Sequence, residues 1–193
     1  MRFGFKRVTM DDIARELAVS KKTIYQFFKD KRELVCLVTQ CHFEDNECQM
    51  EKLEAESENV VVFLIKATQM MRGHLSKVNP GALVDLQKHF PEGWKIFLRH
   101  KNEVILKSIA NTLTRGQQEG YFRSNFSPEI LATMRMETIQ AALDERVFPS
   151  QKFDRIEVNT QIMEHFIEGI LTEKGRKVYN DYLNQYTGDE NTI

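Results

Sequence analysis

Apolar residues recur at helical spacing along almost the whole chain, and this pattern predicts an all-α protein. The spacing indicates helices at about residues 9–18, 20–28, 34–56, 59–78, 82–90, 91–119, 128–147 and 153–171. No alternating run of β-branched residues bounded by turn pairs interrupts the series. The 193 residues suffice for one ordinary domain, or for a small domain joined to a larger one.

Two short helices near the N-terminus are predicted to meet across a tight turn. Thr9 is suited to cap the first helix, and Asp11 and Asp12 place negative charge in its first turn, where the helix dipole favours it. Ser20 is suited to cap the second helix, which begins about two residues after the first one ends. Helices joined in this way form a helix-turn-helix unit.

The second short helix has an apolar face and a polar face. Ile24, Phe27 and Phe28 form the apolar face. The polar face, at spacings of three, four and seven residues, consists of Lys22, Tyr25, Gln26 and Lys29. Lysines neutralise phosphates, whereas Thr, Gln and Tyr side chains reach base edges or phosphate oxygens. The pattern predicts a recognition helix for the major groove of DNA; the alternative is the solvated basic face of a helical packing unit.

Charge is distributed unevenly, although the net charge is only −1. Residues 1–35 carry nine Lys or Arg and five acids, a balance of +4, whereas residues 40–60 carry seven acids and one Lys, a balance of −6. A basic end beside an acidic stretch indicates a surface that faces a polyanion. Chance clustering on solvated helix faces is the alternative.

A longer helix is predicted to follow the helix-turn-helix. Asp30 and Glu33 have the spacing of a capping box, and Lys31 in the first turn is placed to reach a phosphate. The predicted buried stripe of this helix consists of Leu34, Leu37, Val38 and Cys41. Its three cysteines, Cys36, Cys41 and Cys48, favour buried free thiols over a disulfide, a zinc site or a redox sensor.

The N-terminal residues resemble the DNA-binding region of the TetR family of bacterial regulators. The resemblance rests on Gly4-Phe5, on residues 8–14 and on residues 17–34. It implies an all-α homodimer with a small three-helix helix-turn-helix domain, expected at residues 1–45, and a larger helical ligand-binding and dimerisation domain, expected at residues 46–193. The family has a full helix before the position of Gly4, so the first helix is expected either to be truncated or missing here or to lie upstream of Met1.

The resemblance also implies the DNA contacts. Thr9, Tyr25, Lys29 and Lys31 would meet phosphates, and residues 21–23 would face bases or nearby phosphates. Together with the polar face of the second helix, the predicted DNA-binding set is Thr9, Ser20, Lys21, Lys22, Thr23, Tyr25, Gln26, Lys29 and Lys31.

The last two predicted helices carry apolar residues on more than one face. Such helices must be buried on more than one side, and two of them from each of two chains would form a four-helix dimer interface. The predicted dimer contacts are Leu131, Ile139, Ala142, Met163, Phe166 and Ile170. An ordinary monomeric core is the alternative.

Methionines and aromatic residues are dense in the middle helices and suit an adaptable pocket for a small apolar or amphipathic effector. The predicted lining residues are Phe63, Met70, Met71, His74, Phe90, Trp94, Phe97 and Met134. For each of them singly, an ordinary place in a helical core explains the residue at least as well.

Catalytic and membrane functions find little support in the sequence. No H-E-x-x-H, G-x-S-x-G or phosphate-binding glycine loop is present, so no enzymatic activity, catalytic residue, metal or cofactor is expected. No segment approaches the roughly 18 apolar residues of a membrane span, and residues 1–8 do not resemble a signal peptide, so the cytoplasm is the expected location.

The sequence as a whole predicts a ligand-responsive transcriptional regulator. The expected form is a repressor that binds a palindromic operator in double-stranded DNA as a homodimer. The alternative is a helical protein–protein adaptor whose helix-turn-helix no longer binds DNA.

Overall fold

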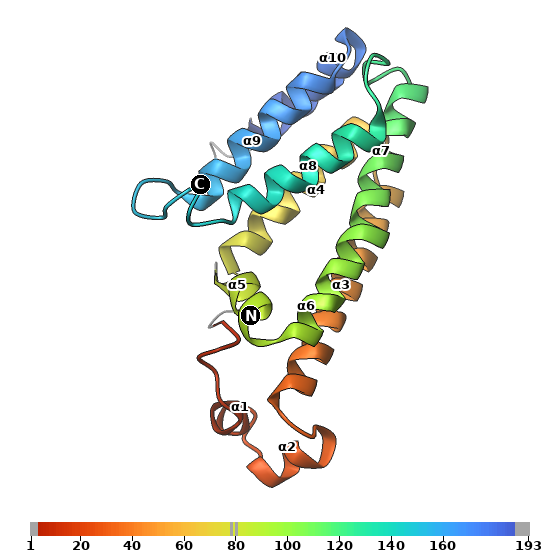
Figure 1. Ribbon diagram of the computed structural model, residues 1–193. Helices are drawn as coiled ribbons and strands as arrows, with labels where there is room; N and C mark the ends of the chain where they lie inside the picture. Colours follow the sequence, from red (N-terminus) through yellow and green to blue (C-terminus); the bar gives the residue numbers. More distant parts are fainter. Residues whose placement is uncertain (1–3, 78, 80, 188–193) are drawn as a thin grey trace. The chain divides into compact units, whose positions relative to one another are not determined.

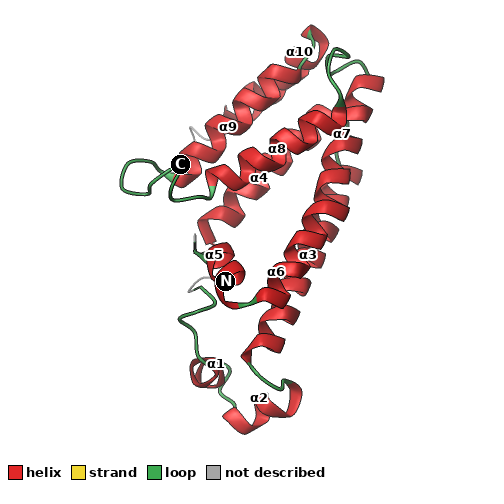
Figure 2. Ribbon diagram, in the orientation of Figure 1, coloured by secondary structure: helices red, strands yellow, loops and turns green. Residues whose placement is uncertain are grey.

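The computed structural model is all-helical and describes residues 4–77, 79 and 81–187 (Figure 1). Its elements are α1 (Met10–Glu16), α2 (Lys21–Phe27), α3 (Lys31–Ala55), α4 (Val60–Lys77), α5 (Ala82–His89), α6 (Pro91–His100), a π-helical turn (Lys101–Ile105), α7 (Leu106–Gln118), α8 (Pro128–Ala142), α9 (Arg155–Ile170) and α10 (Glu173–Thr187). Figure 2 shows helices and loops throughout, and an isolated antiparallel bridge joins Phe122 to Leu171. The predicted all-α fold class is confirmed. The expected truncation of the first helix concerns residues 1–3, which lie outside the described residues.

The chain forms two compact units. The first unit comprises Met1–Cys48 and Lys77–Glu103, and the second unit comprises Gln49–Ser76 and Val104–Ile193. This grouping by packing places α5 and α6 with the N-terminal helices. Packing does not reveal which residues bind DNA, so the expected functional boundary near residue 45 stays a prediction.

Two hydrophobic clusters lie in the first unit. The smaller one buries Met10 and Ala14 of α1 against Ile24 of α2. The larger one contains Phe5, Val35, Ala82, Leu86, Phe90 and Phe97. Phe27, which the apolar spacing assigned to the apolar face of the second short helix, is 73% exposed, and Leu17 of the turn after α1 is 62% exposed. That assignment is wrong because the short helices α1 and α2 already use Met10, Ala14 and Ile24 for their mutual contact.

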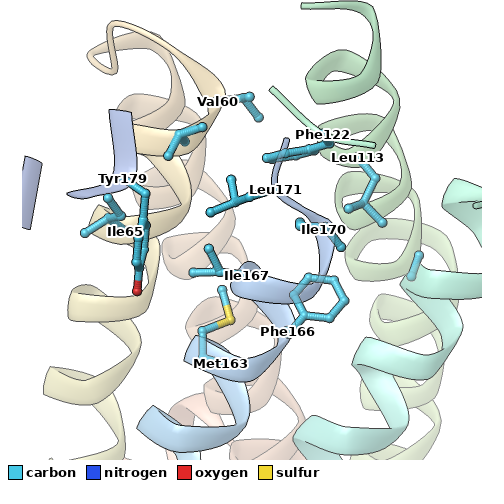
Figure 3. Close-up of a cluster of buried hydrophobic side chains, with 12 residues drawn as sticks. Val60, Ile65, Leu113, Phe122, Met163, Phe166, Ile167, Ile170, Leu171 and Tyr179 are labelled. Carbon is cyan, nitrogen blue, oxygen red and sulfur yellow. The ribbon is translucent and has the colours of Figure 1, made fainter. Parts of the chain in front are cut away.

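One larger cluster forms the core of the second unit (Figure 3). Its buried members are Val60, Val61, Ile65, Leu113, Phe122, Ala132, Met163, Phe166, Ile167, Ile170, Leu171 and Tyr179. The loop after α7 is fastened to the end of α9, because the Arg123 N–H donates to the Ile170 carbonyl at 2.8 Å and the Thr172 N–H donates to the Tyr121 carbonyl at 2.9 Å. The core therefore joins residues far apart in the sequence.

The C-terminal part of the chain differs from the predicted helices. The pattern predicted no helix after residue 171, whereas α10 packs Val178, Tyr179, Tyr182 and Leu183 against the core of the second unit. These four residues have helical spacing, so the signal was present in the sequence. Helix α8 ends at Ala142 rather than near residue 147, and a loop leads from there to α9.

The predicted long helix over residues 91–119 contains an irregularity. The π turn at Lys101–Ile105 separates α6 from α7. A π turn closes hydrogen bonds over five residues instead of four, so it takes up one extra residue that helical periodicity does not anticipate. None of the described helices is both long and apolar enough to cross a membrane.

Candidate nucleic-acid interface

The turn between α1 and α2 is held by backbone hydrogen bonds and one left-handed residue. Ala18 has a φ of 53°, and the Val19 N–H donates to the Ala14 carbonyl at 3.0 Å. A left-handed residue after a helix reverses the chain within a short distance. Helix α2 therefore begins at Lys21, across the short turn that a helix-turn-helix requires.

Side-chain caps begin both short helices, as predicted. The Asp12 N–H donates to Thr9 Oγ1 at 3.1 Å, and the Thr9 N–H donates to Asp12 Oδ2 at 2.9 Å, which is a complete capping box. The Thr23 N–H donates to Ser20 Oγ at 3.0 Å. Hydrogen bonds from Thr9 hold the pKa of the Asp12 carboxyl below its ordinary value. The Thr9 and Ser20 hydroxyls thus fix the helix ends, whatever else they contact.

The polar face of α2 is open. Lys22, Tyr25 and Gln26 are exposed, whereas Ile24 is buried against α1. In the described part of the chain, the side chains of Lys22 and Gln26 make no hydrogen bond or ion pair. The cation and the amide are therefore free to meet an external acceptor, which is the arrangement that a recognition helix needs.

Lys29 does not lie on the same helical face. Helix α2 ends at Phe27, and Phe28 has an extended backbone with φ −132° and ψ 124°. The expected seven-residue helical spacing from Lys22 to Lys29 is therefore wrong. Lys29 is instead exposed in the connection to α3, where its backbone N–H donates to Glu33 Oε2 at 2.6 Å.

The start of α3 matches the predicted cap in part. Asp30 Oδ1 accepts from the backbone N–H groups of Arg32 at 2.8 Å and Glu33 at 3.0 Å. The Glu33 carboxylate reaches back to the N–H of Lys29 rather than to that of Asp30. Both carboxylates together fix the connection between α2 and α3.

Two of the predicted DNA-contacting lysines have partners within the chain. Lys21 Nζ forms an ion pair with Asp11 Oδ2 at 2.8 Å between α2 and α1, and this hydrogen bond raises the pKa of Lys21. Lys31 Nζ donates to the Lys6 carbonyl at 3.3 Å and lies 5.6 Å from the centroid of the Phe90 ring. Partial burial lowers the pKa of Lys31. Both lysines therefore help to hold the first unit together.

The remaining predicted sites are spread over both units. Of the predicted pocket residues, Phe90, Trp94 and Phe97 belong to the first unit, where the Trp94 and Phe97 rings stack with centroids 4.8 Å apart. The residues Phe63, Met70, Met71, His74 and Met134 belong to the second unit. Phe63 is buried, whereas Met71 and Met134 are 39% and 48% exposed. A shared pocket stays a prediction.

The predicted dimer contacts are largely covered within one chain. Ala142, Met163, Phe166 and Ile170 are each at most 9% exposed, and Leu131 and Ile139 are half-buried. The exposed apolar side chains of α8 are instead Ile130 and Met134, at 70% and 48%.

The side of α3 that is buried also differs from the prediction. Leu37 and Val38 are 48% and 40% exposed, and Cys41 and Cys48 are exposed as well. The buried residues of α3 are Val35 and Thr39. The predicted stripe and the expectation of buried thiols are thus wrong at these positions, because the neighbours α5 and α6 decide which side of α3 is covered.

Three buried polar side chains escaped the sequence-based prediction. Thr39, Arg135 and Asn159 are at most 8% exposed, and each has a fully buried polar atom without a hydrogen-bond partner in the described part of the chain. Their signal in the sequence is a polar residue on an otherwise apolar helix face. Residues 4–77, 79 and 81–187 contain no group of three His, Cys, Asp or Glu side chains that could hold a metal ion.

A tight turn between two capped helices, with an open cationic face on the second, defines a DNA-binding protein of the helix-turn-helix class. Residues 1–36 match the sequence profile of bacterial regulatory proteins of the tetR family. The helix-turn-helix region of the chain thus resembles that of the TetR family of DNA-binding transcriptional regulators.

The sequence similarity to known proteins covers most of the chain. The chain is 25% identical over 170 residues to the uncharacterized HTH-type transcriptional regulator YvaF of Bacillus subtilis, covering 86% of this chain and 87% of YvaF. It is 23% identical over 176 residues to the fatty acid metabolism regulator protein of Bacillus subtilis, again covering 86% and 87%. The structure of the transcriptional regulator FadR from Bacillus subtilis in complex with stearoyl-CoA shares the fold, with a TM-score of 0.62, 19% identity, and 86% and 91% of the two chains covered.

Proposed function

We propose that this protein is a repressor that binds a palindromic operator as a homodimer and releases it when a small apolar or amphipathic effector binds. The observation that carries the DNA contact is the open polar face of α2, where Lys22 and Gln26 have no partner in the described part of the chain. Tyr25 extends this face, with 46% of its surface exposed. We assign base and phosphate contacts to these residues, with Thr23 and Lys29 at the flanks.

A homodimer is supported by the exposed apolar residues of α8. Ile130 and Met134 lie one helical turn apart on one side of the helix. Burial of such side chains against a second copy stabilises an association by roughly 1.5–3 kcal/mol for each side chain. Two recognition helices held one turn of DNA apart, about 34–36 Å, would read the two halves of a palindrome.

Two observations support regulation by an effector: the known roles of similar proteins, and a helix that runs from the first unit into the second. One relative regulates fatty acid metabolism, and a FadR structure holds stearoyl-CoA. Helix α3 begins at the helix-turn-helix in the first unit and continues past Cys48 into the second unit. An effector that changes the second unit thus has a covalent connection to the DNA-binding helices. Coupling between two sites of this kind is typically 5- to 150-fold in affinity.

The test of the DNA contact is a binding titration against duplex DNA from upstream of the protein's own gene at several salt concentrations. We expect Lys22→Ala to weaken binding and to reduce the salt dependence by about one phosphate contact. Tyr25→Phe should weaken it about 3- to 10-fold through the loss of one hydrogen bond. The matched control is Lys107→Ala, which removes an exposed lysine from α7.

Two outcomes would contradict the proposal in different ways. Unchanged affinity in both α2 variants would refute the assigned contacts. Absence of specific binding by the unmodified protein at submicromolar concentration would instead favour the adaptor alternative.

A further inference from the structure

Arg135 is a buried cation in the second unit. It lies on the buried face of α8 with Ala132 and Met136, and it is 8% exposed. Its Nη1 is fully buried and has no hydrogen-bond partner in the described part of the chain. Its guanidinium lies over Phe166 of α9, with Arg135 Cζ 5.6 Å from the ring centroid.

No anion among the described residues compensates the charge of Arg135. Burial lowers the pKa of Arg135 to about 10, and no carboxylate contributes to that shift. At neutral pH the guanidinium therefore remains a cation. A buried charge without a paired anion is strongly unfavourable, and such groups are normally paired with a counter-charge. The site is incomplete without an external anion.

A second unpaired donor lies on the neighbouring helix. Asn159 of α9 is 7% exposed, and its Nδ2 is fully buried without a partner in the described part of the chain. Like Nη1 of Arg135, an amide Nδ2 donates hydrogen bonds and accepts none. Asn159 precedes Phe166 by seven residues, about 10 Å along α9, so each of the two unsatisfied donors calls for an acceptor atom of its own. A carboxylate or phosphate headgroup supplies such an acceptor to Arg135.

The surroundings of Arg135 are apolar and adaptable. Met136 follows it on the same face of α8, and Met163 lies one turn before Phe166 on the buried face of α9. Figure 3 shows Met163 and Phe166 on successive turns of α9 within the core cluster. Methionine side chains rearrange at low cost because they are unbranched and flexible. They are the side chains that an alkyl chain entering beside Arg135 would displace.

A second copy that docks on the exposed apolar face of α8 would not supply the anion. The exposed apolar residues of α8, Ile130 and Met134, lie on a different face from Arg135, Ala132 and Met136. A partner docked on the exposed face would leave the Arg135 side of the helix inside its own chain.

We infer that Arg135 binds the anionic headgroup of an amphipathic effector inside the second unit, with the alkyl chain between α8 and α9. This inference rests on the proposed effector-responsive function and names the chemistry of the effector. Arginine binds carboxylates and phosphates through paired hydrogen bonds, so both headgroups fit the same site.

The experiment compares three twelve-carbon probes by isothermal titration calorimetry with the full chain: dodecanoate, dodecyl phosphate and neutral methyl dodecanoate. At least one anion should bind about 10-fold or more tightly than the ester, because charge-assisted hydrogen bonds are lost with the ester. The comparison between the two anions identifies the headgroup. Arg135→Met should remove the preference for the anion, and Arg135→Lys should retain part of it. The matched control is Arg72→Met, which removes an exposed arginine from α4.

Thermal unfolding without any probe separates binding from a structural role. Removal of an uncompensated buried charge should leave the Tm of Arg135→Met equal to or above that of the unmodified protein. A lower Tm, together with an undiminished preference for the anion, would show that Arg135 only supports the core.

The remaining outcomes are also decisive. Equal binding of anions and ester by the unmodified protein, or no binding of any probe, overturns the inference even if Arg135→Met fails to fold. If that same protein still binds its promoter DNA, the proposed regulator function stands without this effector. If it binds neither DNA nor probe, the proposed function fails as well.

Discussion

The ring of His100 stacks on that of Phe43 in the first unit. The two ring centroids are 4.6 Å apart, with an interplanar angle of 11°. Burial lowers the pKa of His100, and the nearby Glu47 carboxylate opposes this effect only in part. Protonation of His100 therefore favours the unfolded chain, where the ring is hydrated.

This shift predicts a pH dependence of stability. The folded protein binds fewer protons than the unfolded chain at pH values near the ordinary histidine pKa of about 6.5. The contribution of His100 to the free energy of unfolding is thus fully present above that pH and decreases as the pH falls towards the folded pKa. His100→Phe keeps an aromatic ring on Phe43 but cannot be protonated. Urea unfolding at pH 5 to 8 should give a smaller loss on acidification for this variant, and identical pH profiles would contradict the prediction.

Features that depend on a few adjacent residues could be predicted from the sequence. Burial that depends on packing against distant segments could not. The caps at Thr9 and Ser20 follow from hydrogen bonds within four residues, so the sequence alone predicts them. The exposure of Phe27 and the unpaired burial of Arg135 depend on which other segments pack nearby. No local pattern contains that information.

Gly116 determines how closely the loop after α7 approaches that helix. A Cβ at Gly116 would overlap the Phe122 ring, which is 2% exposed in the core of the second unit. The backbone N–H of Phe122 donates to the Gly116 carbonyl at 3.0 Å, so the backbone that carries the ring is held close to Gly116. The packing of this loop against α7 therefore requires a residue without a side chain at position 116.

We expect Gly116→Ala to lower the free energy of unfolding by about 1–3 kcal/mol, the usual effect of overpacking a core. Gly73→Ala is the matched control, because a Cβ there meets nothing within 4 Å on the exposed side of α4. The control should be neutral or stabilising by up to about 1 kcal/mol, since alanine favours a helix over glycine. Denaturant unfolding measures both, and equal effects of the two substitutions would refute the role of Gly116.

Helix positions were predicted well where the apolar spacing is regular and less well at the helix ends. The end of α2 at Phe27 was missed because the apolar pattern continues through Phe28 while the backbone already becomes extended. Helix α10 was missed although Val178, Tyr179 and Tyr182 have helical spacing, because its many polar residues obscure that stripe.

At the scale of the whole molecule, the proposed homodimer should depend on the exposed apolar residues of α8. We expect Ile130→Glu to raise the dimer dissociation constant roughly 100-fold, because a symmetric interface contains the residue twice. Light scattering over a concentration series measures this change. Val84→Glu is the matched control, because Val84 is an exposed apolar residue of α5. A dimer that survives Ile130→Glu and is lost with Val84→Glu would place the interface elsewhere.

The resemblance to the TetR family and the all-α class could be predicted from the sequence, because a short, ordered motif indicates the first and helical periodicity the second. The division into two compact units could not be predicted, because α5 and α6 pack with the N-terminal helices although residues 49–76 separate them in the sequence. Contacts between Val35, Leu86 and Phe97 of the larger first-unit cluster have no periodic signature in the sequence.

The π turn at Lys101–Ile105 also bears on how such a chain tolerates changes in length. One residue rotates an α-helix by about 100°, so an insertion in a regular helix would turn every downstream side chain away from its partners. A π turn absorbs that residue locally and leaves the faces on either side in phase. Deletion of one residue from this turn is therefore expected to restore a regular α-helix and to leave the side chains of α7 facing the core of the second unit.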